Sequence, residues 1–136
     1  MNGILPSISG IPAFALSMIL AGIILWGFMR IYTKMTPYHE QELIRSGNAA
    51  AAISYSGTLI GFVLGISAAV SNSVNLFDLA IWALIAGAVQ CLVFKGMLRS
   101  YPTLPQMITE GQIAPAIKLA AVSIAAGLLN AASMTY

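Results

Sequence analysis

Four long apolar stretches follow one another along the chain, and short polar stretches separate them. The apolar stretches run from Ile11 to Tyr32, from Ala49 to Val70, from Phe77 to Leu98 and from Ala114 to Met134. As a helix, each would be about 30 Å long, which matches the hydrocarbon core of a bilayer. The pattern predicts an all-α membrane protein in which residues 1–136 form a single domain of four transmembrane helices.

The polar stretches contain signals for helix starts. Thr36 and Pro37 predict a short interfacial helix, with Thr36 as its N-cap and Pro37 in its first turn. A turn at Gly47 leads to Asn48, which we expect to cap the second span. Asp78 is expected to cap the third span in the same way.

Basic residues gather beside two of the three polar stretches. All six flank the first or the third stretch: Arg30, Lys34, Arg45, Lys95, Arg99 and Lys118. Cytoplasmic loops of membrane proteins carry an excess of Lys and Arg. We therefore expect both of these loops in the cytoplasm, and both termini and the loop from Ser71 to Asp78 on the periplasmic side.

Composition narrows the class of protein further. Only 7% of the residues are charged and 59% are hydrophobic, whereas a soluble domain has roughly a quarter of its residues charged. The net charge of +2 comes from scattered residues that form no basic stripe, so we expect no binding to nucleic acid. The single cysteine, Cys91, permits no disulfide within the chain and is expected to serve in packing.

The two halves of the chain resemble each other, which predicts a duplication. A shift of 65 positions pairs Gly22 with Gly87, Arg30 with Lys95, Lys34 with Arg99, and Pro37 with Pro102. A shift of 64 positions then pairs Ile44 with Ile108, Gly47 with Gly111, Asn48 with Gln112, and Ala52 with Ala116. We predict two tandem helical hairpins, residues 11–70 and 77–134, with the same orientation in the membrane. Chance matching among Ala- and Gly-rich helices is the alternative.

Small residues at four-residue spacing mark helix faces that can approach closely in lipid. The second span has Gly57, Gly61 and Gly65, and the fourth has Ala121 and Ala125 at the matching places. We expect these faces to form the tightest helix contacts. The sequence leaves open whether they join the two hairpins of one chain or two separate chains, and the first is favoured.

Several polar side chains lie within the predicted spans. Gln90, Asn130, Ser54 and Thr58 either form hydrogen bonds between helices or line a polar pathway. Leaving an amide without partners in lipid costs several kcal/mol, so the amides must face protein or water. Lys118 lies about one turn inside the fourth span and is expected to reach back to the interface.

The sequence contains no residue pattern that indicates catalysis or metal binding. His39 stands near Glu40 and Glu42 in the first polar stretch, without a second histidine or a cysteine at ligand spacing. We expect these side chains to form a solvated helix face. No nucleophile with a base, no glycine-rich phosphate loop and no carboxylate pair is recognisable, so we expect neither a cofactor nor an enzyme.

Short motifs along most of the chain resemble a known family. They are Thr36-Pro37, Glu40, Leu43-Ile44, Asn48-Ala49-Ala50-Ala51, Ser56-Gly57-Thr58-Leu59, Trp82, Gln90 and Leu129-Asn130-Ala131-Ala132. The chain resembles the YjfL family of small bacterial inner-membrane proteins, defined by a domain of unknown function. The resemblance implies four spans, a duplicated hairpin, the bacterial inner membrane, and a part in envelope stress or membrane maintenance beside membrane-coat proteins. The chain departs from the family pattern at Gln112 and Pro115.

Two functional hypotheses follow. The first is a non-enzymatic homo-oligomer in the lipid bilayer that presents its cytoplasmic loops, including Thr36, Pro37, Glu40 and Asn48, to membrane-coat or stress proteins. The second is an oligomeric channel or transporter for ions or small solutes, because four short helices enclose little volume on their own.

Overall fold

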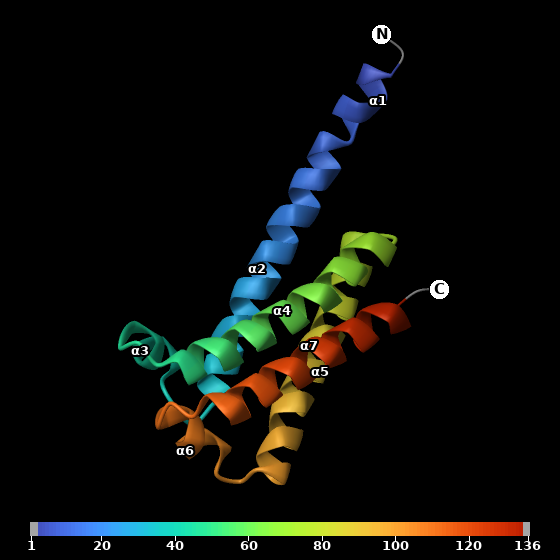
Figure 1. Cartoon of the computed structure of the whole chain (residues 1–136). Helices are drawn as coiled ribbons and strands as arrows, with labels where there is room; N and C mark the ends of the chain where they lie inside the picture. Colours follow the sequence, from blue (N-terminus) through green and yellow to red (C-terminus); the bar gives the residue numbers. More distant parts are fainter. Residues whose placement is uncertain (1–2, 135–136) are drawn as a thin grey trace.

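The computed structural model describes residues 3–134 and is built from helices. Their order is α1 Ile4–Ser9, α2 Ile11–Met35, α3 Glu40–Arg45, α4 Ala49–Asn72, α5 Leu76–Ser100, α6 Leu104–Thr109 and α7 Ile113–Ser133 (Figure 1). Four helical stretches in the described chain are long and apolar enough to cross a membrane, with α1 and α2 counted as one. The predicted all-α, four-span class is confirmed. The ends of the predicted domain, residues 1–2 and 135–136, lie outside the described residues.

The first span is longer than predicted at both ends. α2 continues past Tyr32 to Met35, and α1 precedes it on nearly the same course (Figure 1). Pro12, in the first turn of α2, has no N–H group to donate, so the helical hydrogen bonds are interrupted between the two helices.

Thr36 and Pro37 end a helix instead of starting one, so the predicted cap is wrong. Thr36 has an extended backbone with ψ of 139° and its N–H donates to the carbonyl of Tyr32 at 3.1 Å. A following proline pushes the preceding residue out of the helical region, which explains the extended backbone. The predicted short helix exists as α3, but it begins at Glu40 with His39 before it.

The caps of the second and third spans differ from each other. Asn48 caps α4 as predicted, since its Oδ1 accepts a hydrogen bond from the Ala51 N–H at 3.0 Å. The cap of α5 is Asn75, whose Oδ1 accepts from the Asp78 N–H at 2.8 Å. Asp78 accepts a hydrogen bond from the N–H of Val74, the residue before the cap, at 3.2 Å, so the prediction that Asp78 is the cap is wrong.

The turns that lead into α4 and α7 have the same backbone. Gly47 and Gly111 have φ of 90° and 82°, a left-handed conformation that glycine adopts without steric cost. In each turn the glycine N–H donates at 3.0 Å to a carbonyl of the preceding short helix. The next N–H, from Asn48 or Gln112, also donates back, at 2.8 and 2.9 Å. These paired bonds are the C-terminal pattern of a helix that ends in a left-handed residue.

α4 and α7 run side by side in the same direction and form the most extensive helix contact (Figure 1). Gly57, Gly61 and Gly65 meet successive positions of α7. A Cβ at Gly57 would overlap Ala120, and one at Gly61 would overlap the backbone of Ser123. The missing side chains therefore let the two backbones touch, and this contact lies within one chain.

The expected contact residues on the fourth span are wrong. Ala121 and Ala125 are exposed, whereas the buried face of α7 carries Ala120, Ser123 and Gly127. α7 is rich in alanine, so small residues occur on more than one face of the helix. Their spacing therefore does not determine which face is buried.

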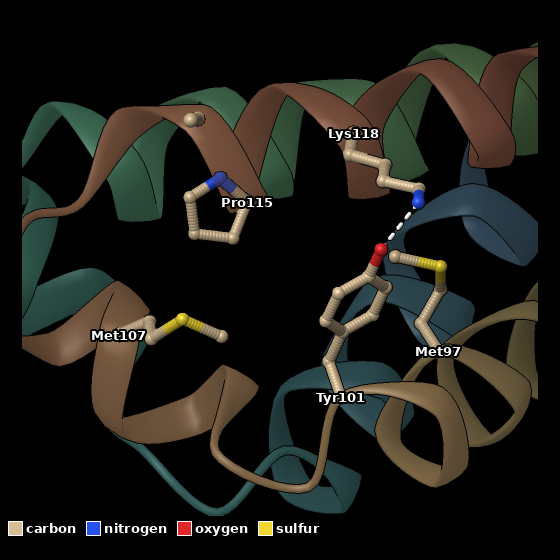
Figure 2. Close-up of a pocket in the computed structure, with 6 residues that line it drawn as sticks. Met97, Tyr101, Met107, Pro115 and Lys118 are labelled. Atoms are coloured by element: carbon tan, nitrogen blue, oxygen red, sulfur yellow. Dashed lines mark hydrogen bonds between the residues drawn. The ribbon is translucent and has the colours of Figure 1, made fainter.

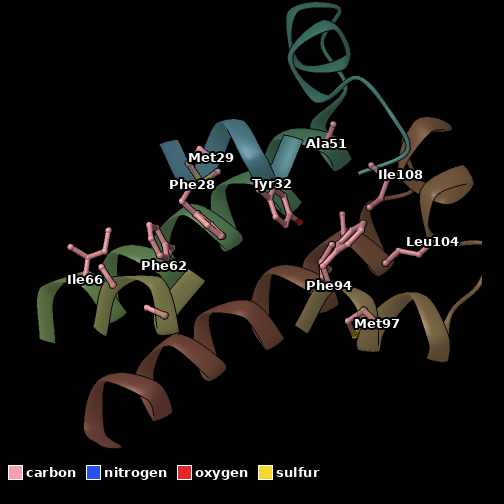
Figure 3. Close-up of a cluster of buried hydrophobic side chains, with 14 of the residues drawn as sticks. Phe28, Met29, Tyr32, Ala51, Phe62, Ile66, Phe94, Met97, Leu104 and Ile108 are labelled. Carbon is pink, nitrogen blue, oxygen red and sulfur yellow. The ribbon is translucent and has the colours of Figure 1, made fainter. Parts of the chain in front are cut away.

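Aromatic side chains join α2 to the bundle. Phe28 stacks on Phe62 of α4 with ring centroids 3.9 Å apart, and Tyr32 meets the edge of Phe94 on α5 at 5.6 Å (Figure 3). Gly87 leaves room for this stack, because a Cβ there would lie 3.0 Å from the ring of Phe28. Before Phe28, no described residue of α1 or α2 is buried, and this part of the chain projects beyond the other helices (Figure 1).

Candidate functional site: buried polar side chains along α4

Polar side chains are buried along the inner face of α4, where an apolar lining would be the simplest arrangement. In the described chain the buried polar residues are Thr36, Glu40, Ser54, Thr58, Gln90 and Ser123. We call Glu40, Ser54, Thr58 and Gln90 the polar core line. Ser54 and Thr58 lie on α4, Gln90 meets α4 at Gly61, and Glu40 lies close to Tyr38, which is beside Ser54. Buried polar groups are costly unless they are hydrogen bonded, so each needs its partners examined.

The two hydroxyls of the line are satisfied by close neighbours. Thr58 Oγ1 donates to the hydroxyl of Tyr32 at 3.1 Å, which links α4 to α2. Ser54 Oγ donates to the carbonyl of Ala51 at 3.1 Å, one turn back along its own helix. Ser54 also lies beside the buried hydroxyl of Tyr38. Ser54 and Thr58 are therefore both hydrogen bonded to protein groups inside the bundle.

Gln90 connects α5 to α7. Its Nε2 donates to the backbone carbonyl of Ser123 at 3.1 Å. The same nitrogen lies above Gly61, where a Cβ would come within 2.7 Å of it. The Gln90 Oε1 atom is buried and has no hydrogen-bond partner among the described residues. Gln90 is therefore a helix bridge that retains one free acceptor in the bundle.

Asn130 lies farther along the α4–α7 contact, toward the end opposite α3. It is half-buried, and its Nδ2 would lie 2.8 Å from a Cβ at Gly65. The structure thus brings Gln90 and Asn130 to the same pair of helices, one turn of α4 apart, at Gly61 and Gly65.

Glu40 is the unusual member of the polar core line. Its side chain is 2% exposed, and neither carboxylate oxygen has a hydrogen-bond partner in the described part of the chain. Burial raises the pKa of this carboxyl to about 7. The nearby Thr36 side chain lowers the pKa, but by less than burial raises it. A buried carboxyl without partners favours the protonated, neutral form.

The expectation of a solvated helix face is therefore wrong for Glu40. His39 and Glu42 are exposed, as expected for such a face. Glu40 points inward instead, together with Leu43 and Ile44 of the same short helix. The spacing of three and four residues between Glu40 and these apolar residues was a sequence signal for a common inner face.

Two of the predicted loop residues, Asn48 and Thr36, form hydrogen bonds with other parts of the chain. Asn48 Nδ2 donates to the carbonyls of Ile108 and Thr109 at 2.9 and 3.2 Å, which ties the start of α4 to the end of α6. Thr36 is buried and its Oγ1 donates to the carbonyl of Thr33 at 3.0 Å. Of the predicted motif, Pro37 alone is exposed.

Charged side chains line a hollow at the α3 end of the molecule. A hollow of about 590 Å³ next to α3 is lined by exposed Lys34, His39, Glu42 and Arg45, and by the buried Glu40. Residues of both signs thus face solvent at the α3 end. Within the described residues, no three His, Cys, Asp or Glu side chains gather as a metal site would require.

The fold, its apolar surface and its buried polar side chains define a multi-pass helical membrane protein. The family model for a Domain of Unknown Function (DUF350) matches residues 6–134. The chain belongs to this family. Two relatives, the UPF0719 inner membrane protein YjfL of Escherichia coli strain K12 and that of Escherichia coli O157:H7, are each 38% identical to it over 109 residues. The alignments cover 80% of this chain and 83% of each relative.

These comparisons confirm the resemblance to the YjfL family. Together with the four apolar helices, the relatives support a multi-pass location in the inner membrane. No solved structure matches the chain.

Proposed function

We propose that this protein is a non-enzymatic membrane platform that assembles into oligomers and presents its α3 and α6 ends to cytoplasmic proteins. The observation that carries the proposal is the first span. From Ile4 to Gly27 it has no buried residue, so its own chain leaves most of its surface uncovered. Helices associate in lipid through close packing, and such a span offers a face for a second copy.

The charged α3 end supports a platform more than an enzyme. Lys34, Glu42 and Arg45 are exposed around one hollow, where they can meet a partner of complementary charge. Membrane-coat and stress proteins are the partners that we propose, in envelope stress or membrane maintenance.

The orientation that we propose places the α3 and α6 ends in the cytoplasm and both termini in the periplasm. All Lys and Arg residues of the chain lie at or near that end of the spans, which supports this orientation. A membrane-impermeant thiol reagent tests it in intact cells, in a Cys91→Ser background. We expect Asn75→Cys to react from outside and Gln41→Cys to react only after the membrane is opened. The reverse pattern contradicts the orientation.

A duplicated hairpin is also part of the proposal. The parallel course of α4 and α7 supports it, as do the matching left-handed turns at Gly47 and Gly111, 64 positions apart. Two spans in each hairpin give both copies the same orientation.

Cysteine crosslinking in native membranes tests the oligomer. In a Cys91→Ser background, Phe14→Cys and Met18→Cys place thiols on the uncovered part of α2, where the side chains are 69% and 65% exposed. We expect disulfide-linked dimers from at least one of them. Leu84→Cys on α5, 72% exposed, is the matched control for random collision in the membrane. Equal crosslinking at all three positions, or monomers only, contradicts the proposal.

Pull-down from solubilised membranes tests the platform. We expect reversal of the exposed charges, with Glu42→Lys and Arg45→Glu, to remove proteins that the wild type retains. Gln106→Ala on α6 is a control that keeps the charges. Retention of the same proteins by all variants contradicts the platform.

A channel or transporter for ions or small solutes is the second candidate. The polar core line favours it, because Glu40 and Gln90 place free acceptor atoms inside the bundle. The backbone contact of Gly57 with Ala120 closes the space between α4 and α7, so a solute path would require several copies. Purified protein in liposomes should then pass ions, and Gln90→Leu should change the flux. Vesicles that stay sealed under all conditions contradict this candidate.

A further inference from the structure

A small cavity lies where α5, α6 and α7 meet. Its volume is about 300 Å³, and it is lined by Met97, Tyr101, Met107, Ala114, Pro115 and Lys118 (Figure 2). We call it the Lys118 cavity. Tyr101 directly follows α5, and Ala114 and Pro115 lie in the first turn of α7. Since α5 ends and α7 begins here, in a membrane the cavity would lie near the boundary between the hydrocarbon and the polar headgroups.

Lys118 supplies the only positive charge of the lining. It lies five residues after the first residue of α7, which corresponds to about 7.5 Å along the helix axis. Its Nζ donates to the hydroxyl of Tyr101 and lies 4.7 Å from the centre of that ring (Figure 2). Among the described residues it makes no ion pair with a carboxylate.

The ammonium group of Lys118 therefore has N–H donors left for a further partner. An ammonium group has three N–H donors, of which Tyr101 accepts one. A cation close to hydrocarbon gains most from a partner that carries a full negative charge.

The remaining lining is apolar. Met97 is buried and Met107 is half-buried. Met107 extends from α6 into the space below α7, and Met97 extends from α5 toward α7 (Figure 2). Methionine side chains are flexible and adapt to irregular apolar groups. The cavity thus combines one cation at its rim with walls that suit a hydrocarbon chain.

We infer that the Lys118 cavity binds an anionic phospholipid of the adjacent leaflet, with the phosphate at Lys118 Nζ and an acyl chain against Met97 and Met107. A cation that has no carboxylate partner and lies beside apolar walls matches the order of groups along a phospholipid. Basic pockets between spans at the membrane surface are known to hold anionic headgroups. A soluble anion would satisfy the lysine but would leave the methionine walls unfilled.

Lipid binding to delipidated protein in detergent tests the inference, with phosphatidylglycerol as the probe and native mass spectrometry as the measurement. We expect Lys118→Gln to weaken phosphatidylglycerol binding about fivefold, the factor that corresponds to about 1 kcal/mol for one cation near the surface. Arg99→Gln is the matched control, because Arg99 is an exposed cation at the end of α5 that does not line the cavity. We expect no change in binding for this control.

The apolar half of the site has its own variant. Met107→Gln keeps the cation and places an amide in the wall, and we expect it also to weaken phosphatidylglycerol binding. It keeps the test decisive if Lys118→Gln does not fold, which circular dichroism and gel filtration will show. Equal binding of phosphatidylglycerol by the wild type and each folded cavity variant overturns the inference. Displacement of the lipid by inorganic phosphate, with Met107→Gln unaffected, overturns it in favour of a soluble anion.

Discussion

Replacing Glu40 by glutamine is expected to stabilise the protein at alkaline pH. The carboxyl is 2% exposed and both of its oxygens lack hydrogen-bond partners in the described residues, so its ionised form is costly in the folded state. Glutamine has nearly the same shape and stays neutral at every pH. The variant should therefore behave like the wild type in which Glu40 is protonated.

The size and sign of the effect follow from the pKa of Glu40. Its ordinary value is 4.5, and burial raises the pKa to about 7. At about 1.4 kcal/mol for each tenfold change, this difference is worth about 3 kcal/mol. The folded state holds the proton more tightly than the unfolded state, so the free energy of unfolding falls as the pH rises from 4.5 to about 7 and is constant above it. The contribution is fully present below the unfolded pKa and is lost as the pH passes the folded pKa.

Unfolding in mixed detergent micelles, measured by circular dichroism between about pH 4 and pH 8.5, is the assay. We expect the wild type and Glu40→Gln to differ little at the acid end. At the alkaline end the variant should be more stable, by an amount approaching about 3 kcal/mol.

Glu42→Gln is the matched control for this prediction. It makes the same chemical change on the same short helix, at an exposed position. Its unfolding curve should run parallel to that of the wild type. If the Glu40→Gln curve also runs parallel to the wild type over the whole range, Glu40 does not titrate as its burial requires and the reasoning is refuted.

Three further substitutions test the helix contacts. Gly61→Leu should prevent α4 from packing on α7, with a loss of helical structure on mild heating, whereas Gly22→Leu should be tolerated because nothing lies within 4 Å of that position. Asn48→Ala removes the cap of α4 and two hydrogen bonds to α6. Thermal unfolding should therefore show that the free energy of unfolding falls by about 2 kcal/mol. Gln112→Ala should have little effect, because Gln112 makes no capping bond. Gln90→Leu should reduce stability by less than about 1 kcal/mol in the same assay. The variant loses the hydrogen bond to Ser123, but it also removes the buried Oε1 atom that has no partner. A loss several times larger would show that Gln90 bonds to more than one partner.

The spans were predictable because lipid imposes a simple physical rule. A segment that crosses the hydrocarbon must be helical and apolar over about 20 residues, so length and composition locate it. The turn at Asn48 was also predictable, because its cap depends on neighbouring residues. Local sequence did not settle every cap, however, because Thr36 ends α2 instead of starting a helix and Asn75, not Asp78, caps α5.

Features that depend on packing were not predictable. The inner face of α7 carries Ala120 instead of Ala121, since in an alanine-rich helix the partner helix decides which small residues are covered. The burial of Glu40 depends likewise on where α3 meets α4. In water a charged residue on a short helix would face the solvent, and only the three-dimensional contact reverses that expectation.

The turns before α4 and α7 have the same backbone conformation but different side chains around them. Both helices follow a left-handed glycine turn with matching hydrogen bonds, at Gly47 and Gly111. Yet Asn48 caps the first helix and also bonds to α6, whereas the second helix has no side-chain cap and carries Lys118, which bonds to Tyr101. Because the backbones agree, the difference lies in the side chains alone. It follows that the two halves cannot offer equivalent binding sites, and that each must be tested by its own variants.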